Sequence, residues 1–160
     1  MISTITNRTA ADLALALTLR NSMIAGQTPS VPQLYAKLER GFFTYLTVYR
    51  IETAQEELSN VLKSYGYSND VKFFKKHSIT DSWSDEIYSY DQYQQLIKNN
   101  KALMNSFCVY STTPECPEYL YEYNNLNDFE KILADIQELI YEMEDNFKKC
   151  GTIQCGGDTL

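Results

Sequence analysis

One apolar repeat constrains this chain more than any other feature of its sequence. Apolar side chains recur at alternating steps of three and four residues over more than twenty positions, namely Leu126, Phe129, Leu133, Ile136, Ile140, Met143 and Phe147. This spacing places them on one face of a helix, for which Asn124 or Asn125 can serve as the N-cap. The face can form the core of a helical bundle or a seam against a second chain, and the two uses can coexist. Because a domain needs a core, we expect mainly the first use.

Two helices are predicted in the N-terminal part of the chain. Thr9 followed by Asp12 is a capping-box pattern, so a helix is expected over residues 10–23. Its narrow apolar stripe consists of Leu13, Ala16, Leu17 and Met23 or Ile24. A second, short helix is expected over residues 30–41, because a serine and a proline head it and a glycine closes it.

Two further helices are predicted in the middle of the chain. The first covers residues 45–65 and ends at Gly66 in a left-handed conformation. Ser89 with Gln92 forms another capping box, which heads a helix over residues 90–107. The inner faces of these two helices consist of Ile51, Ala54, Leu58, Val61, Leu62 and Tyr65, and of Tyr93, Ile97, Leu103 or Met104 and Phe107. The sequence therefore predicts a mainly α fold, a helical bundle of four to five helices.

The remaining segments are predicted to be connections. Residues 67–85 mix a basic run with turn-favouring Asn, Asp and Ser, so we expect a long irregular connection there. Residues 111–117 hold two prolines and form a linker within the fold. We expect one helical domain over residues 1–150 and a short glycine-rich C-terminal tail over residues 151–160. The tail is either disordered or added to the sheet edge of another subunit.

Length and charge exclude several kinds of partner. A chain of 160 residues suits one domain, and a formal net charge of −7 argues against neutralising the phosphates of a nucleic acid. No stretch approaches the roughly 20 apolar residues of a membrane span. Residues 1–11 lack the apolar core of a signal peptide. We expect no nucleic-acid partner, no membrane partner and synthesis in a cytoplasm.

The negative charge is concentrated at the C-terminal end of the chain. Residues 115–160 hold eleven acidic residues and three lysines, a net charge of −8, whereas the first 114 residues carry +1. A solvated helix face accounts for most of this asymmetry, and a basic partner surface is the alternative.

The cysteines and the single histidine do not form a recognisable reactive site. Seven residues separate Cys108 from Cys116 and four separate Cys150 from Cys155, spacings unlike those of structural zinc sites, and His77 is distant in sequence. A cysteine nucleophile also needs a base beside it. We therefore predict free thiols, no catalytic residues, no metal site and no cofactor.

Aromatic residues are the compositional feature that stands out, with thirteen Tyr, seven Phe and one Trp. A tyrosine ring buries apolar area while its hydroxyl stays hydrated or bonded, which favours protein interfaces. Trp83 either plugs the edge of the core, the commoner role of a lone Trp in a connection, or anchors a partner. The candidate interface residues are Tyr119, Tyr121, Tyr123, Ile153, Cys155 and Trp83.

Several stretches of the sequence are similar, in order, to motifs of one protein family. Residues 6–12, Thr-Asn-Arg-Thr-Ala-Ala-Asp, are like its N-R-T-x-A-D-V opening. Residues 40–44, Arg-Gly-Phe-Phe-Thr, are like its K-G-A-Y-N motif. Residues 49–52, Tyr-Arg-Ile-Glu, are like its N-R-V-E motif.

Three more stretches continue the same order. Trp83 with residues 87–93 is like the segment W-x-x-x-D-I-P-T-x-x-x-M-x-R-Y. Residues 112–118 are like a T-T-P-x-L-P-E turn, and residues 129–136 are like an I-E-K-I-L-x-D-I helix. The chain thus resembles uncharacterised structural proteins that are encoded in the tail region of phages and prophages of Gram-positive bacteria.

The resemblance implies a non-enzymatic virion component of the tail tip or baseplate, assembled in the cytoplasm of the bacterial host. Its partners would be other virion subunits, and it would form a homo-oligomer such as a trimer or hexamer. The alternative is a phage-encoded module that binds a host or regulatory protein. The family's tail reads as an aromatic residue followed by repeated S-G-E, whereas residues 149–157 keep the two glycine positions of that repeat, Gly151 and Gly156, but place Cys before each. The Ala25-Gly26-Gln27 sequence also replaces the usual G-W after the first helix, and these departures leave the partner of the tail open.

Overall fold

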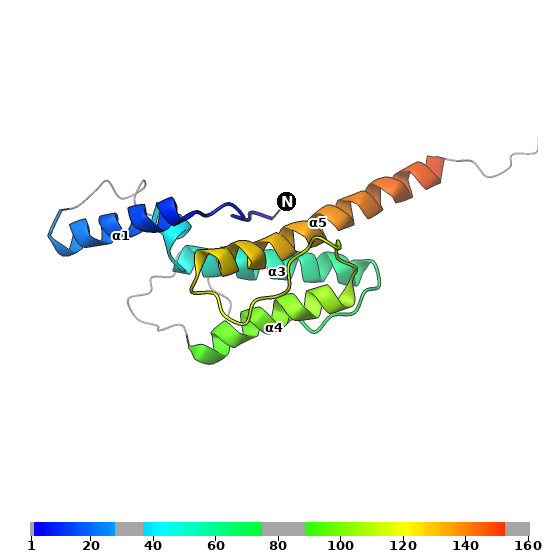
Figure 1. Ribbon diagram of the computed structural model, residues 1–160. Helices are drawn as coiled ribbons and strands as arrows, with labels where there is room; N and C mark the ends of the chain where they lie inside the picture. Colours follow the sequence, from blue (N-terminus) through cyan, green and yellow to red (C-terminus); the bar gives the residue numbers. More distant parts are fainter. Residues whose placement is uncertain (1, 28–36, 75–88, 153–160) are drawn as a thin grey trace, which may run out of the picture.

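The protein is mainly helical, as the apolar patterns predicted. A computed structural model describes residues 2–27, 37–74 and 89–152, without the side chains of residues 147–152. Residues 37–41 are helical as well, at the end of the short helix predicted over residues 30–41. The helices with both ends in these ranges are α1 (Ala10–Ile24), α3 (Tyr45–Ser64), α4 (Tyr90–Ser106) and α5 (Tyr123–Thr152) (Figure 1). None of these helices is long and apolar enough to cross a lipid bilayer.

Capping boxes fix the starts of α1, α3 and α4, and those of α1 and α4 were predicted. The Thr9 hydroxyl accepts a hydrogen bond from the Asp12 amide, and the Asp12 carboxylate accepts one from the Thr9 amide. Ser89 and Gln92 cap α4 in the same reciprocal way. The predicted Asn cap of α5 is wrong, because that helix already begins at Tyr123 and both asparagines lie inside its first turn.

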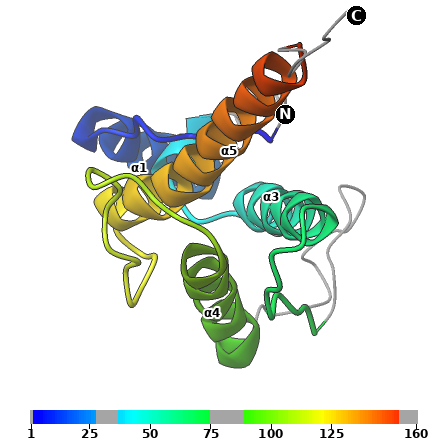
Figure 2. The same ribbon diagram turned by 90° about the vertical axis from the view of Figure 1, so that its right-hand side faces the viewer.

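The core lies between α3, α4 and α5, which pack against one another as Figure 2 shows. The C-terminal repeat contributes five buried side chains, which confirms its predicted use as a core face: Leu126, Phe129, Leu133, Ile136 and Ile140. The C-terminal end of α5 projects from the bundle (Figures 1 and 2). The helix runs to Thr152, two residues past the predicted domain boundary, and residues 153–160 lie outside the described ranges.

The predicted apolar stripe of α1 is wrong as a core face. Of its residues only Ala16 is buried, while Leu17, Met23 and Ile24 are exposed. The physical reason is that α1 lies to one side of the three-helix core (Figures 1 and 2), so none of those helices covers its stripe. An ion pair between Arg40 and Asp12, with N and O 2.8 Å apart, holds α1 against the following segment.

Gly41 permits this close approach, and we expect Gly41→Ala to separate the two segments. A Cβ at this position would lie 2.3 Å from the Cβ of Ala16 and 2.9 Å from the carbonyl oxygen of Asp12. Overpacking of this kind costs about 2 kcal/mol. Hydrogen exchange should therefore speed up in α1 while α3 and α5 keep their protection. Unchanged exchange in α1 would contradict the contact.

A buried ion-pair cluster ties the extended N-terminal segment to the bundle. The Arg8 guanidinium contacts Glu130 at 2.6 Å, and both side chains are fully buried. Glu130 also pairs with Arg50 at 2.7 Å, and Arg50 pairs in turn with Glu39. The backbone N–H and C=O of Arg8 bond to the Asn127 amide, both at 2.9 Å. The segment is therefore fixed to α3 and α5 although it forms no regular secondary structure.

A second buried network joins the three core helices through carboxamides. The Gln55 amide donates to the Asn100 side-chain oxygen and to the Leu96 carbonyl, both at 2.8 Å. The Asn100 amide donates to the carbonyl of Phe129 at 3.0 Å. Asn99 bonds to Gln55 and to the backbone of Lys72, which attaches the predicted irregular connection to α4. These directional bonds fix how α3, α4 and α5 are rotated against one another.

Candidate protein-interaction site

Two of the predicted interface tyrosines lie together on the surface. The rings of Tyr119 and Tyr121 stack with centroids 4.4 Å apart and an interplanar angle of 12°. Tyr123, the first residue of α5, is half-buried and does not line the pocket beside them. The other three predicted residues, Trp83, Ile153 and Cys155, lie outside the described residues.

The stacked rings border a depression of about 360 Å³ between α4 and the segment before α5. We call it the aromatic pocket, and it is lined by Phe43, Tyr90, Tyr93, Gln94, Glu118, Tyr119, Leu120 and Tyr121. Tyr90 and Tyr121 are 74% and 75% exposed, which is unusual for large rings. Five aromatic rings thus surround one depression with only two polar side chains.

The aromatic pocket has packed side chains beneath it. Leu120 is fully buried, and its backbone N–H donates a hydrogen bond to the hydroxyl of Tyr93. The Phe43 ring meets the Tyr93 ring edge-on, with centroids 6.0 Å apart and an angle of 74°. Burial raises the pKa of Tyr93, so its hydroxyl stays neutral at physiological pH. The exposed rings are therefore presented on a packed support.

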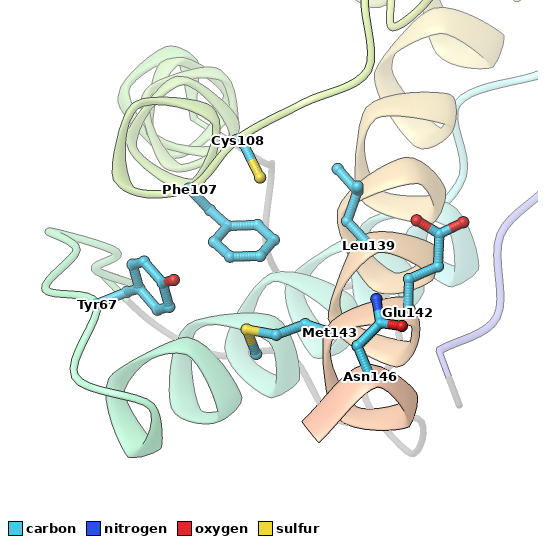
Figure 3. Close-up of a pocket in the computed structure, with 7 residues that line it drawn as sticks. All are labelled: Tyr67, Phe107, Cys108, Leu139, Glu142, Met143 and Asn146. Atoms are coloured by element: carbon cyan, nitrogen blue, oxygen red, sulfur yellow. The ribbon is translucent and has the colours of Figure 1, made fainter. Parts of the chain in front are cut away.

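A second depression, of about 410 Å³, lies where α5 leaves the bundle. We call it the C-terminal groove, and it is lined by Tyr67, Phe107, Cys108, Leu139, Glu142, Met143 and Asn146. The rings of Tyr67 and Phe107 meet edge-on at 4.9 Å and face the α5 side chains Leu139 and Met143 (Figure 3). The floor is apolar, and the exposed Glu142 stands at the rim.

Among the described side chains, several carboxylates lie beside this groove. Burial, together with a hydrogen bond to Glu142 and the nearby Glu138 and Asp135 charges, raises the pKa of Tyr110 to about 12. The Tyr65 hydroxyl donates to Glu144 at 2.7 Å, and this bond raises the pKa of Tyr65. The apolar groove thus lies in a negative field.

These raised tyrosine pKa values predict a loss of stability in alkali. A phenol whose pKa is raised from about 10 on folding contributes stability that is complete below pH 10. This contribution is lost as the pH rises through the folded pKa, about 12 for Tyr110. Unfolding should therefore become easier between these two values. A titration followed by phenolate absorbance should show some tyrosines that ionise well above pH 10. The Tyr110→Phe variant should have one fewer of these late-ionising tyrosines. Ionisation of all tyrosines at one midpoint near 10 would contradict this.

Potential metal ligands do not cluster among the described residues, and burial deactivates one of the described thiols. Among the described residues, no three His, Cys, Asp or Glu side chains are grouped so that they could hold a metal ion. Burial raises the pKa of the Cys116 thiol to about 11, which makes it a poor nucleophile. His77, Cys150 and Cys155 lie outside the described side chains.

Sequence analysis did not predict five members of the aromatic pocket, which are Phe43, Tyr90, Gln94, Glu118 and Leu120. Tyr93 was predicted as an inward-facing residue, and it does pack against the core while it lines the pocket. The residues come from three segments far apart in the chain, so only the tertiary fold brings them together. Comparison with family models, with curated proteins and with solved structures found no match to this chain.

Proposed function

We propose that this chain is a non-enzymatic structural subunit of a phage or prophage tail, of the tip or baseplate region. It works through contacts with other virion subunits. The observation that carries the proposal is the aromatic pocket, in which Tyr90 and Tyr121 are held exposed on a packed support. Rigid, exposed tyrosine rings lose little conformational entropy on binding, and such rings are enriched at the energetic centres of interfaces.

The arrangement of the motif residues supports the proposal. Arg8, Gly41, Arg50 and Glu130 come from four of the stretches that resemble the tail-protein family. They meet in the ion-pair cluster and in the α1 contact that hold the N-terminal segment in place. Four of the six resembling stretches thus take part in the contacts that hold the N-terminal part of the chain in place.

The test is incorporation into particles. Purified virions should contain the wild-type chain by mass spectrometry. Tyr90→Ser combined with Tyr121→Ser should lower its amount at least about tenfold, because exposed aromatic anchors dominate binding energy. Tyr141→Ser is the matched control, since Tyr141 is also exposed but lies on α5, away from the pocket. A chain found only in cell lysate, bound to a host protein, would refute the tail assignment and favour the host-directed alternative.

A further inference from the structure

The C-terminal groove has the features of a docking site for an apolar side chain with positive neighbours. Its floor of Phe107, Leu139 and Met143 is open to solvent, and Glu142 stands at its rim. Other carboxylates on the same helix, Glu138 and Glu144, add to the negative field. An occupant that matches this surface has one large apolar group flanked by lysine or arginine.

The chain itself presents such a group on another face. Phe74 is 70% exposed. Lys72, two residues before it, is also exposed and forms a short-range ion pair with Asp70. The sequence continues with Lys75 and Lys76, so residues 70–76 contain three lysines and one acid, 3 − 1 = +2. This segment and the groove are complementary in both polarity and charge.

We propose that a second copy of this chain occupies the C-terminal groove, with Phe74 as the inserted side chain and Lys72 facing the acidic rim. The inference builds on the proposed function, since it names one of the subunit contacts, and it concerns a different surface from the aromatic pocket. A copy cannot fill its own groove in this way. Phe74 lies against Gln92 and Gln95 near the start of α4, whereas the groove lies at the end of that helix.

The two halves of this contact are different surfaces, so the interface is heterologous. Each copy would donate a phenylalanine to one neighbour and accept one from another. Repetition of such a contact closes into a ring or continues as a filament. The contact accounts for the opposite charges of the two segments, which a like-to-like contact of the acidic helix would not use.

The experiment measures self-association of the full-length chain by sedimentation. The wild-type chain should associate reversibly with a dissociation constant below about 100 µM. The association should be weaker in high salt, because the contact pairs opposite charges. Phe74→Ser removes the donor, and Met143→Lys places a charge in the acceptor groove. Each variant should associate at least about tenfold more weakly. Cys108→Arg is a second acceptor variant that uses an exposed position, so the test holds even where Met143→Lys impairs folding. Ile24→Ser, which removes an exposed apolar side chain of α1 that lines neither depression, should associate like wild type.

Mixing the two kinds of variant gives the sharpest result. A chain with only a donor and a chain with only an acceptor should form a complex that stops at one copy of each. A monomeric wild type at about 100 µM would overturn the proposal. Association that persists in both the donor and the acceptor variants would also overturn it, and this is the result expected if two copies instead pair through the projecting end of α5. A mixture of the two variants that stays monomeric would overturn it as well. These outcomes do not depend on whether the chain is found in virions, so the two proposals can fail separately.

Discussion

Replacing Glu130 by glutamine is expected to lower the free energy of unfolding by about 3 to 5 kcal/mol, the cost of breaking a buried ion pair by removing one partner. Glu130 is fully buried, and its carboxylate accepts bonds from Arg8, from Arg50 and from the backbone N–H of Ile5. Arg50 keeps Glu39 in the variant, but Arg8 remains buried without a carboxylate. The N-terminal segment should therefore detach before the bundle unfolds.

Denaturant unfolding followed by circular dichroism measures this loss, with Glu138→Gln as the control. Glu138 is an exposed carboxylate on the same helix, so its loss should cost less than about 0.5 kcal/mol. Combining Arg8→Met with Glu130→Leu should recover part of the stability, because no uncompensated charge then stays buried. A Glu130→Gln protein as stable as the control would mean that the cluster does not fix the segment.

The Glu130 position also shows how far the sequence alone could predict this fold. The residue lies four positions after Leu126 and three before Leu133, on the side of the helix that the apolar repeat assigns to the core. Helix positions, two capping boxes and the core use of α5 were predicted because each depends on neighbours within a few residues. A polar residue at a core position, in contrast, needs a partner that only the tertiary fold supplies, here Arg8 at the other end of the chain.

The same distinction explains the errors. The stripe of α1 has the spacing of a core face, but burial needs a neighbouring helix, and α3, α4 and α5 leave Leu17 and Met23 exposed. The aromatic pocket was only partly predicted for a related reason. Alternation of tyrosines in residues 119–123 was visible in the sequence, whereas its meeting with Tyr90 and Phe43 depends on how three distant segments pack.

Gln55→Ala is expected to cost about 3 kcal/mol, through lost hydrogen bonds and the space left in the core. Gln55 is fully buried and bonds to Leu96, Asn99 and Asn100 of α4. Its removal leaves the side-chain oxygen of Asn100 without its donor in a place that water does not reach. The apolar spacing of α3 also places Gln55 on the core side of the helix, because it lies four positions after Ile51 and three before Leu58.

Thermal and denaturant unfolding measure this loss, and hydrogen exchange locates it. Exchange should speed up in α4 and in residues 67–74, because Asn99 links Gln55 to the backbone of Lys72. Glu57→Gln is the control, since Glu57 lies on the same helix but is exposed. If Gln55→Ala cost less than about 1 kcal/mol, the carboxamides would fill space without orienting α3 against α4. The rigid support beneath the aromatic pocket would then have to come from the apolar core alone.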